Sequence, residues 1–369
     1  MSWVRRAGAL FSLALAAFSL EAQIIVRSPN PETSLKERWE WACTVGSKSI
    51  ETKEYWVGYS IKRLMDEDSY LSGGNMFSGE LRGRRNLYAI LENSDADSSK
   101  IPVSRQSHGK HRIFKKLKDV AILFRVSGDE PGGESVQKIL TTNMELSVDL
   151  KNIPLLWLGS AEDEQSVQHL KSLFARLTTT KLKENLVQTV GIHQQSNAVF
   201  PFLANLLKSD ESDDIRALAA FWIGEQNQQE GLGLLMESAQ KDRSLKVREQ
   251  AVFAISLMDS DESVESLISL AQKPGDTKVR SKAAFWLGNK ASQKVVTVLE
   301  NIVADDIETD VQRQALFALA RNQDREGVDR LIRIAKTHPN PHIRKQAVQC
   351  LGQSEDSRAL DALIEIVRK

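Results

Sequence analysis

The sequence predicts an α+β protein overall, with a small N-terminal β-rich domain and a C-terminal all-α superhelical solenoid. Three observations predict this fold class. The last 160 residues repeat with a period of 32, and such a period is typical of stacked helical repeats. Residues 24–152 lack the period and contain short apolar runs between glycine-rich turns. Residues 1–22 form a separate segment with a basic start and an apolar middle.

Each repeat unit begins with a helix, helix A. Five segments align through an Ile or Val, followed four residues later by alanine and eight residues later by a large aliphatic residue. This spacing places the three positions on one helical face. An alanine at the same position in all five units indicates that neighbouring helices approach closely there, because a larger side chain would overpack. These alanines are Ala219, Ala251, Ala283, Ala315 and Ala347.

A second helix, helix B, follows in each unit. Helix A has a start residue three positions before the Ile or Val, and the best of these are N-caps such as Ser212 and Asp276. A second set of start residues follows in the same frame, including Ser260 and Ser292, with Gln228 as its weak member. An apolar pattern follows each of them, so every unit is predicted to be two helices joined by a short turn.

One column of helix A alternates between large and small side chains. It lies seven residues past the Ile or Val and reads Trp222, Ala254, Trp286, Ala318 and Cys350. We interpret the alternation as interlocking of neighbouring units. An aromatic ladder that binds a ligand is the alternative interpretation.

The repeats resemble HEAT repeats, of the short HEAT-like type of the phycobilisome-lyase family. The segments VREQAVFAIS (247–256), VRSKAAFWLG (279–288) and IRKQAVQCLG (343–352) carry the resemblance. It implies a solenoid over residues 153–369 with about seven helix pairs, beginning where Pro154–Gly159 resembles the end of a helix A. Such repeats serve scaffolds, lyases and hydroxylases alike, so the resemblance indicates the fold and leaves the function open.

Residues 1–22 resemble a secretory signal peptide. Arg5 and Arg6 give a positive start, and Ala7–Leu20 is a 14-residue apolar stretch, too short to span a bilayer. We expect cleavage after Ala22 and export to the periplasm or the medium, with no transmembrane segment in the mature chain. An uncleaved N-terminal anchor is the alternative.

Residues 23–152 are predicted to form a small α+β or mainly β domain. Pro31–Val45 is the expected helix. Strands are expected at Tyr55–Ile61, Leu87–Leu91, Val120–Val126 and Met144–Leu150, because these runs are apolar or alternate with polar residues.

One stretch of that domain, Lys100–Lys118, is strongly basic and contains His108 and His111 but no acid. It is either a patch for an anionic partner or a solvated loop. Lys+Arg and Asp+Glu both number 49 in the whole chain. This balance gives no general attraction to nucleic acid, so we expect no nucleic-acid partner.

No pattern of catalytic residues is found in the sequence, and we expect no catalytic residue, metal or cofactor. The resemblance implies one iron site, because the HEAT-repeat hydroxylases bind iron through His-Glu pairs. None of the six histidines here is followed by glutamate, so that ligand set is missing. Cys43 and Cys350 are interpreted as buried free thiols, although export would permit a disulfide.

The sequence therefore predicts a non-catalytic exported scaffold that binds a protein partner through the solenoid surface. The resemblance places helix B on the concave face, and the polar side of that helix changes charge from unit to unit. The residues expected to bind the partner are Glu265, Asp329, Arg333, Asp361 and Glu365. A solvated face without a partner is the other interpretation. An enzyme or enzyme accessory of lyase or oxidoreductase type, with its site in the N-terminal domain, is the alternative function.

The signal-peptide interpretation predicts the start of the mature chain. Because the apolar stretch ends just before Ala22, N-terminal sequencing of protein from the envelope or medium should begin near Gln23. An intact Met1 on protein from the cytosol would contradict the prediction.

Overall fold

The computed structural model describes residues 23–67, 69–72, 75–77, 86–92, 114–130, 133–210, 212–273, 275–290, 292–321, 325–354 and 356–368. The chain divides into two compact units, Met1–Phe202 and Leu203–Lys369. The expected signal peptide, His108 and His111 lie outside the described residues. Within the described ranges, no helix combines the length and apolar character needed to cross a membrane.

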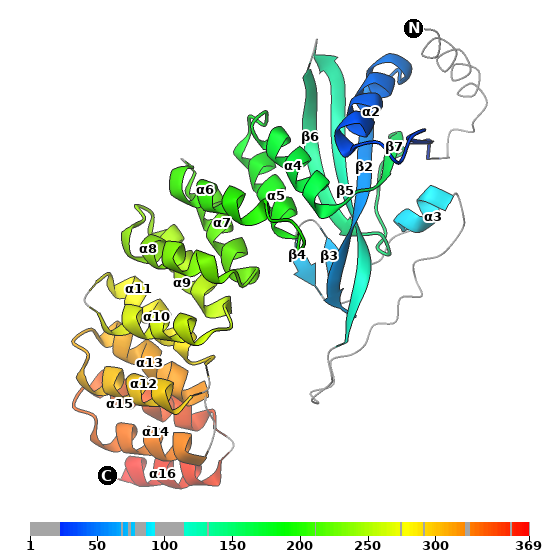
Figure 1. Cartoon of the computed structure of the whole chain (residues 1–369). Helices are drawn as coiled ribbons and strands as arrows, with labels where there is room; N and C mark the ends of the chain where they lie inside the picture. The colour runs from blue at the N-terminus through cyan, green and yellow to red at the C-terminus, as the bar shows by residue number, and fades with distance from the viewer. Residues whose placement is uncertain are drawn as a thin grey trace. The chain divides into compact units, whose positions relative to one another are not determined.

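The N-terminal unit is built on a mixed sheet (Figure 1). Its described strands run in the order β1-β7-β2-β5-β6-β3-β4. Strand β7 pairs in parallel with both β1 and β2, whereas the other pairs are antiparallel. The strands are β1 (Ile25–Arg27), β2 (Glu54–Asp66), β3 (Tyr70–Ser72), β4 (Asn75–Phe77), β5 (Lys115–Glu130), β6 (Gly133–Asn143) and β7 (Leu155–Ser160).

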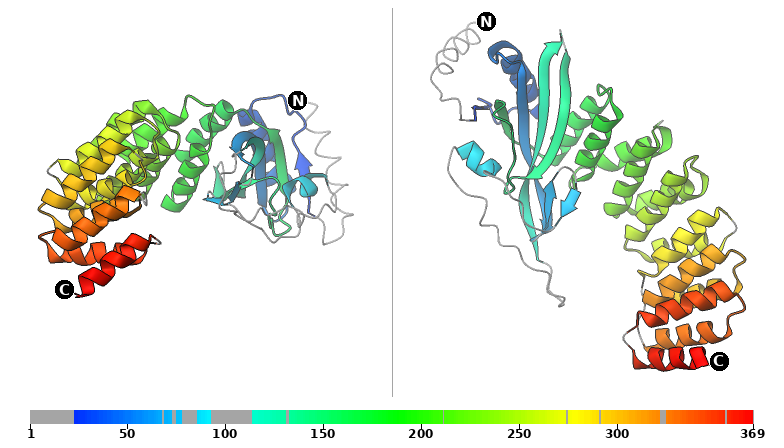
Figure 2. Two further views of the ribbon diagram at one scale, coloured as in Figure 1. Left: turned by 90° about the horizontal axis from the view of Figure 1, so that it is seen from below. Right: turned by 180° about the vertical axis from the view of Figure 1, so that it is seen from behind.

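Helices cover both faces of this sheet (Figure 2). On one face, Trp39 of α2 (Leu35–Ser49) contacts the ring of Phe124 edge-on. The same face carries α4 (Asp163–Phe174), whose Ser166 reaches the hydroxyl of Tyr59 at 2.8 Å, and α5 (Thr180–Gly191). The opposite face packs against α3 (Leu87–Glu92) through Trp56 and Leu123, because successive strand residues point to opposite faces.

The expected helix and two of the expected strands of this unit are confirmed. The helix spans Leu35–Ser49, and the two strand segments lie within β2 and β5. The strand expected at Leu87–Leu91 is wrong, because this segment is helix α3, whose start is fixed by the Asn86 side chain accepting from the Ala89 N–H at 2.8 Å. Met144–Leu150 is also no strand. It is a turn and an irregular segment that places Met144, Leu146 and Leu150 in the core, which produces the alternating pattern.

The segment expected to end a first helix A is a strand instead. Leu155–Ser160 is β7, between β1 and β2 in the sheet. Residues Leu155 to Leu158 are all buried. A short, fully apolar run has the same sequence pattern in a core strand and in a core helix, so the pattern alone does not distinguish the two. The solenoid therefore does not start near residue 153, and α4 and α5 lie in the unit that contains the sheet.

The C-terminal unit is the predicted solenoid of alternating A and B helices (Figure 1). After α6 (Val199–Ser209), the A helices are α7 (Asp213–Glu225), α9 (Leu245–Leu257), α11 (Thr277–Leu287), α13 (Thr309–Arg321) and α15 (Pro341–Gly352). The B helices are α8 (Leu232–Lys241), α10 (Asp261–Gln272), α12 (Gln293–Asp305), α14 (Arg325–Thr337) and α16 (Ser357–Arg368).

Helix starts follow the predicted caps. The side chains of Ser212, Asp276, Ser260 and Ser292 each accept a hydrogen bond from a main-chain N–H in the first turn. The weak member, Gln228, makes no such bond, and a short 3-10 turn (Gln229–Gly231) precedes α8. Ser244 also makes no such bond although α9 begins regularly, so a capping side chain favours a regular start but is not required for one.

The A helices approach one another at main-chain distance. All five structural alanines are fully buried. At the small column near the end of helix A, a Cβ added to Gly224 would lie 2.3 Å from the main-chain oxygen of Ala254. A Cβ on Gly288 would lie 2.8 Å from the Cα of Ala318. The glycines therefore allow a contact that any larger residue would prevent.

The alternating column is interior only in part. Trp222 and the two alanines are buried, but Trp286 is half-buried and its ring lies 4.7 Å from that of Phe253. Cys43 and Cys350 are both free thiols and buried, as interpreted from the sequence. Burial raises the pKa of the Cys350 thiol.

The close contact predicts a difference between two glycine-to-alanine variants. Gly224→Ala should lower the free energy of unfolding by about 1–3 kcal/mol, the usual cost of overpacking. Gly352 has no atom within 4 Å of an added Cβ, so Gly352→Ala is the matched control and should leave stability unchanged or slightly higher. Urea denaturation measures both. Equal effects of the two substitutions would contradict the close contact.

Candidate functional site

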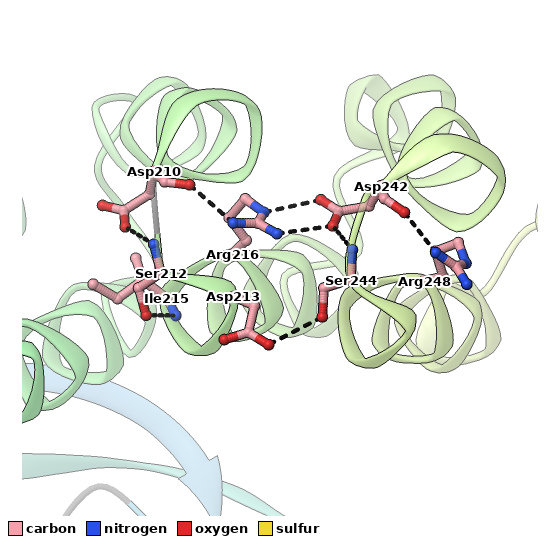
Figure 3. Close-up of polar contacts among 8 residues, drawn as sticks. All are labelled: Asp210, Ser212, Asp213, Ile215, Arg216, Asp242, Ser244 and Arg248. Carbon is pink, nitrogen blue, oxygen red and sulfur yellow. Dashed lines mark hydrogen bonds and ion pairs between the residues drawn. The ribbon is translucent and has the colours of Figure 1, made fainter.

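A buried guanidinium–carboxylate pair joins successive units of the solenoid (Figure 3). Arg216 of α7 donates from Nε and Nη2 to the two carboxylate oxygens of Asp242, both at 2.9 Å. Its Nη1 donates to the main-chain oxygen of Asp210 at 3.0 Å. Arg216 therefore ties the loop before its own helix to the loop before the next A helix.

This contact repeats along the stack, and we name the set the Arg–Asp ladder. Arg248 donates to Asp276 at 2.9 Å, and its Nη1 donates to the main-chain oxygen of Asp242 at 2.8 Å. In the last pair a neutral amide contact replaces the charges, at 3.2 Å. The pairs are Arg216–Asp242, Arg248–Asp276, Arg280–Asp306 and Gln312–Asn340.

The first pair of the ladder is shielded from water. The side chains of Arg216 and Asp242 are 4% and 9% exposed. The hydrogen bonds to Asp242 raise the pKa of Arg216. Burial alone would raise the pKa of Asp242, but hydrogen bonds from Arg216 and from the Ser244 N–H outweigh it, and the pKa is lowered. Both groups stay charged at neutral pH, so removing one would leave a buried charge without its partner.

The polar sides of the B helices form the surface predicted to bind a partner, here named the B face. All of its positions are exposed except the half-buried Ser269, and the five expected binding residues lie on it. Its members are Gly233, Glu237, Gln240, Glu265, Ser269, Gln272, Thr297, Asn301, Ala304, Asp329, Arg333, Lys336, Asp361, Glu365 and Arg368.

Four of the five expected binding residues form ion pairs with a neighbouring unit. Arg358 pairs with Asp329 at 2.8 Å. The other pairs are Lys294–Glu265, Arg333–Glu300 and Lys336–Glu365. The described residues provide no ion pair to Asp361. The structure thus aligns the five residues on one face but pairs them between units, not with one another. An exposed pair of this kind contributes only about 0–1 kcal/mol, so a partner's charges can replace it at low cost.

The outward side of the A helices carries aromatic rings. Phe221 stacks on Phe253 with centroids 6.2 Å apart, and Phe253 contacts Trp286. The guanidinium of Arg321 lies 4.7 Å from the centre of the Phe285 ring. These rings are half-buried against one another, so most of their apolar surface is already covered within the solenoid.

A Ser–His pair lies in the N-terminal unit. Ser166 Oγ is 2.7 Å from His193 Nε2 and 2.8 Å from the hydroxyl of Tyr59. All three side chains are at most 1% exposed. His193 Nδ1 lies 3.1 Å from the Val190 main-chain oxygen, and burial lowers the His193 pKa. A substrate cannot reach these buried side chains, and their hydrogen bonds are made within the unit. The cluster therefore has a structural role and holds α4 and the end of α5 on the sheet.

The described residues contain no group of three or more His, Cys, Asp or Glu side chains that could hold a metal ion. His338 is buried, and its Nε2 lies 2.7 Å from the Val303 main-chain oxygen. His169 packs 4.6 Å from the Trp39 ring, and burial lowers its pKa to about 4.

Only the end of the basic stretch is described. There Lys118 is buried in β5 and donates to the main-chain oxygens of Glu67 and Ser69 at 2.6 and 2.9 Å. Its ammonium also lies 3.9 Å from the centre of the Tyr70 ring. This lysine therefore has a structural role and does not belong to an exposed anion-binding patch.

Sequence reasoning missed the Arg–Asp ladder, although its signal is present. Four of the five aligned segments have arginine directly after the Ile or Val. An aspartate precedes the next helix A in three cases, Asp242, Asp276 and Asp306. The aromatic rings of helix A were also missed. Four units carry phenylalanine six residues past the Ile or Val.

Comparisons with known proteins identify the repeats. Residues 200–288 and 296–369 match the family model described as HEAT repeats, so the C-terminal solenoid consists of HEAT repeats. The search of curated proteins finds no match.

Three solved structures are similar to the chain at low identity. The CpcE–CpcF complex of phycocyanin lyase from Nostoc sp. PCC7120 is 18% identical, with a TM-score of 0.33, over 42% of this chain and 97% of that one. YIBA from Escherichia coli is 21% identical, with a TM-score of 0.35, over 56% and 76%. Human deoxyhypusine hydroxylase in complex with glycerol is 17% identical, with a TM-score of 0.28, over 55% and 76%. Likenesses this weak give no argument about function.

The ladder predicts a large effect of one arginine. Arg216→Ala should lower the free energy of unfolding by about 3–5 kcal/mol, because Asp242 would remain buried and unpaired. Arg358→Ala is the control, since the Arg358–Asp329 side chains are 30% and 63% exposed, and it should cost about 0–1 kcal/mol. Guanidinium denaturation of both variants measures the difference. A loss below about 1 kcal/mol for Arg216→Ala would show that the buried pair does not hold the units together.

Proposed function

We propose that the chain is a non-catalytic scaffold, exported by its N-terminal segment, which binds a protein partner through the B face of its HEAT-repeat solenoid. The observation that carries the proposal is the pairing of B-face charges between units. These charges lie in one line across successive helices, exposed and held only by weak contacts. A partner segment lying along that line meets several of them at once.

The charge pattern suits an extended protein segment of mixed sign. Among the five binding residues both signs are present, with Glu265, Asp329, Asp361 and Glu365 acidic and Arg333 basic, so a matching segment carries mainly basic residues and one acid. Such an arrangement favours one register of a partner with complementary charges and disfavours others. Between the charges, Ser269, Thr297 and Asn301 are small or polar, so a main chain can approach closely and form hydrogen bonds.

The outward side of the A helices supports the proposal less well. Its phenylalanines stack on one another and are half-buried, whereas nearly all positions of the B face are exposed. A partner on the A side would gain little further apolar burial. The two sides can be distinguished by experiment.

A photo-crosslinking amino acid at two positions tests which side is occupied. Asn301 lies on the B face, and the exposed Lys282 lies on the A helix α11. In intact cells, the variant with the crosslinker at Asn301 should form one defined protein adduct, and the variant at Lys282 should not. The adduct gives the partner's identity by mass spectrometry. The same adduct from Lys282 alone would contradict the B-face proposal.

Charge reversal then measures how much the charged residues of the B face contribute to the affinity for the partner. The double variant Glu265→Lys/Arg333→Glu keeps the net charge and should weaken binding of that partner at least tenfold, with a smaller dependence on salt. The control Asp214→Lys/Lys246→Glu reverses an exposed ion pair between A helices and should leave affinity unchanged. Isothermal titration calorimetry at two salt concentrations measures the affinity. If the B-face variant keeps its helix content and binds with unchanged affinity, these charges are not part of the binding site.

A further inference from the structure

Helix α16 exposes side chains whose counterparts are buried or half-buried in earlier units. Val367 is 84% exposed, whereas its counterparts Ala239, Ala271, Val303 and Ala335 are between 0% and 5% exposed. Leu360 is 61% exposed, whereas its counterparts Val296 and Val328 are 6% and 3% exposed and the other two are half-buried. Ile364 is 43% exposed, whereas Ile268 at the same position is 7% exposed and the other three counterparts are half-buried.

The packing of earlier B helices explains the difference. Each B helix from α8 to α14 packs mainly against helix A of the following unit. The columns that contain Leu360 and Val367 lie on that side. On α16, the positions i, i+4 and i+7 form an apolar stripe of Leu360, Ile364 and Val367, which is shaped to receive another helix.

Charges flank this stripe on one edge. Asp361 and Arg368 lie beside it, seven residues apart, and neither forms an ion pair with another described residue. Together with Ile364 and Glu365, they line a hollow on the surface of α16. Glu365 itself is engaged by Lys336 at 2.6 Å, which leaves one acid and one base for an incoming helix.

The order of these residues is self-complementary. Two α16 helices placed antiparallel about Ile364 bring Leu360 and Asp361 of one copy level with Val367 and Arg368 of the other. A twofold axis between the helices keeps the charged edge of both copies on the same side, so each Asp361 faces an Arg368 and the contact occurs twice. The apolar stripes meet in the centre, with Ile364 against Ile364 in the hollow.

We infer that α16 is a homodimer contact, in which a second copy of this chain packs its own α16 antiparallel on the stripe of Leu360, Ile364 and Val367. The contact uses Asp361 and Arg368 at the α16 end of the B face and leaves the B-face residues of α10, α12 and α14 uncovered for the proposed partner. It places two solenoids end to end about a twofold axis, so that one assembly presents two B faces.

Sedimentation velocity of the full chain across a concentration series tests the contact. We expect reversible dimers that Ile364→Glu weakens at least tenfold. Ile307→Glu is the matched control, because Ile307 is 90% exposed in the loop before α13, and it should leave the dimer unchanged. Asp361→Arg should weaken the dimer, and adding Arg368→Asp should restore it. Glu265→Lys/Arg333→Glu should not affect it, which separates this inference from the proposed function.

A cysteine crosslink tests the twofold geometry. Only an isologous contact places a residue opposite itself, so Ile364→Cys should give a disulfide-linked dimer on mild oxidation and Ile307→Cys should not. A chain that is monomeric throughout the series would overturn the inference. So would a dimer that Ile364→Glu leaves unchanged, or an Ile364→Glu effect only on binding of a different protein.

Discussion

Helix A of one unit rests on helix A of the next at main-chain distance, and the rest of the solenoid depends on this contact. Gly224 and Gly288 face the backbones of Ala254 and Ala318, where no Cβ would fit. At the other end of the same helices, guanidinium groups hold the loops together, as the buried Arg216 does with Asp242. The two contacts fix both ends of α7 and α11 and so set their register on the next A helix.

The B helices are joined differently, and this difference separates structure from binding. Besides packing on helix A of the next unit, neighbouring B helices form ion pairs that range from the largely buried Arg330–Glu300 to the exposed Arg358–Asp329. The exposed pairs contribute little to stability. The B face can therefore vary its charges from unit to unit, and exchange them with a partner, without loosening the A-helix contacts that hold the fold.

The sequence was sufficient for the solenoid because the repeat supplies five aligned copies of the same physical constraint. A buried alanine such as Ala283 recurs at one position, and its burial follows from the period alone. The N-terminal unit offers a single copy of each element. There the apolar run of Leu155–Ser160 fits a core strand and a core helix equally well, and only its pairing with β1 and β2 decides the question.

The candidate site could be placed on a face from sequence, but its chemistry could not. The period located Glu265, Asp329, Arg333, Asp361 and Glu365 on the exposed side of helix B, as the structure has them. Their partners are set by the distance between units, which no local pattern encodes. The same holds for Arg216, whose carboxylate lies 26 residues away in the sequence, and for α16, whose exposed stripe only a comparison with the other units distinguishes from core.

Hydrogen exchange of the complex with the crosslinked partner tests the central claim most directly. If the B face is the binding surface, partner binding slows amide exchange in α10, α12 and α14, while α9, α11 and α13 exchange as in the free chain. Slower exchange confined to the A helices, or to the sheet of the N-terminal unit, would contradict the account.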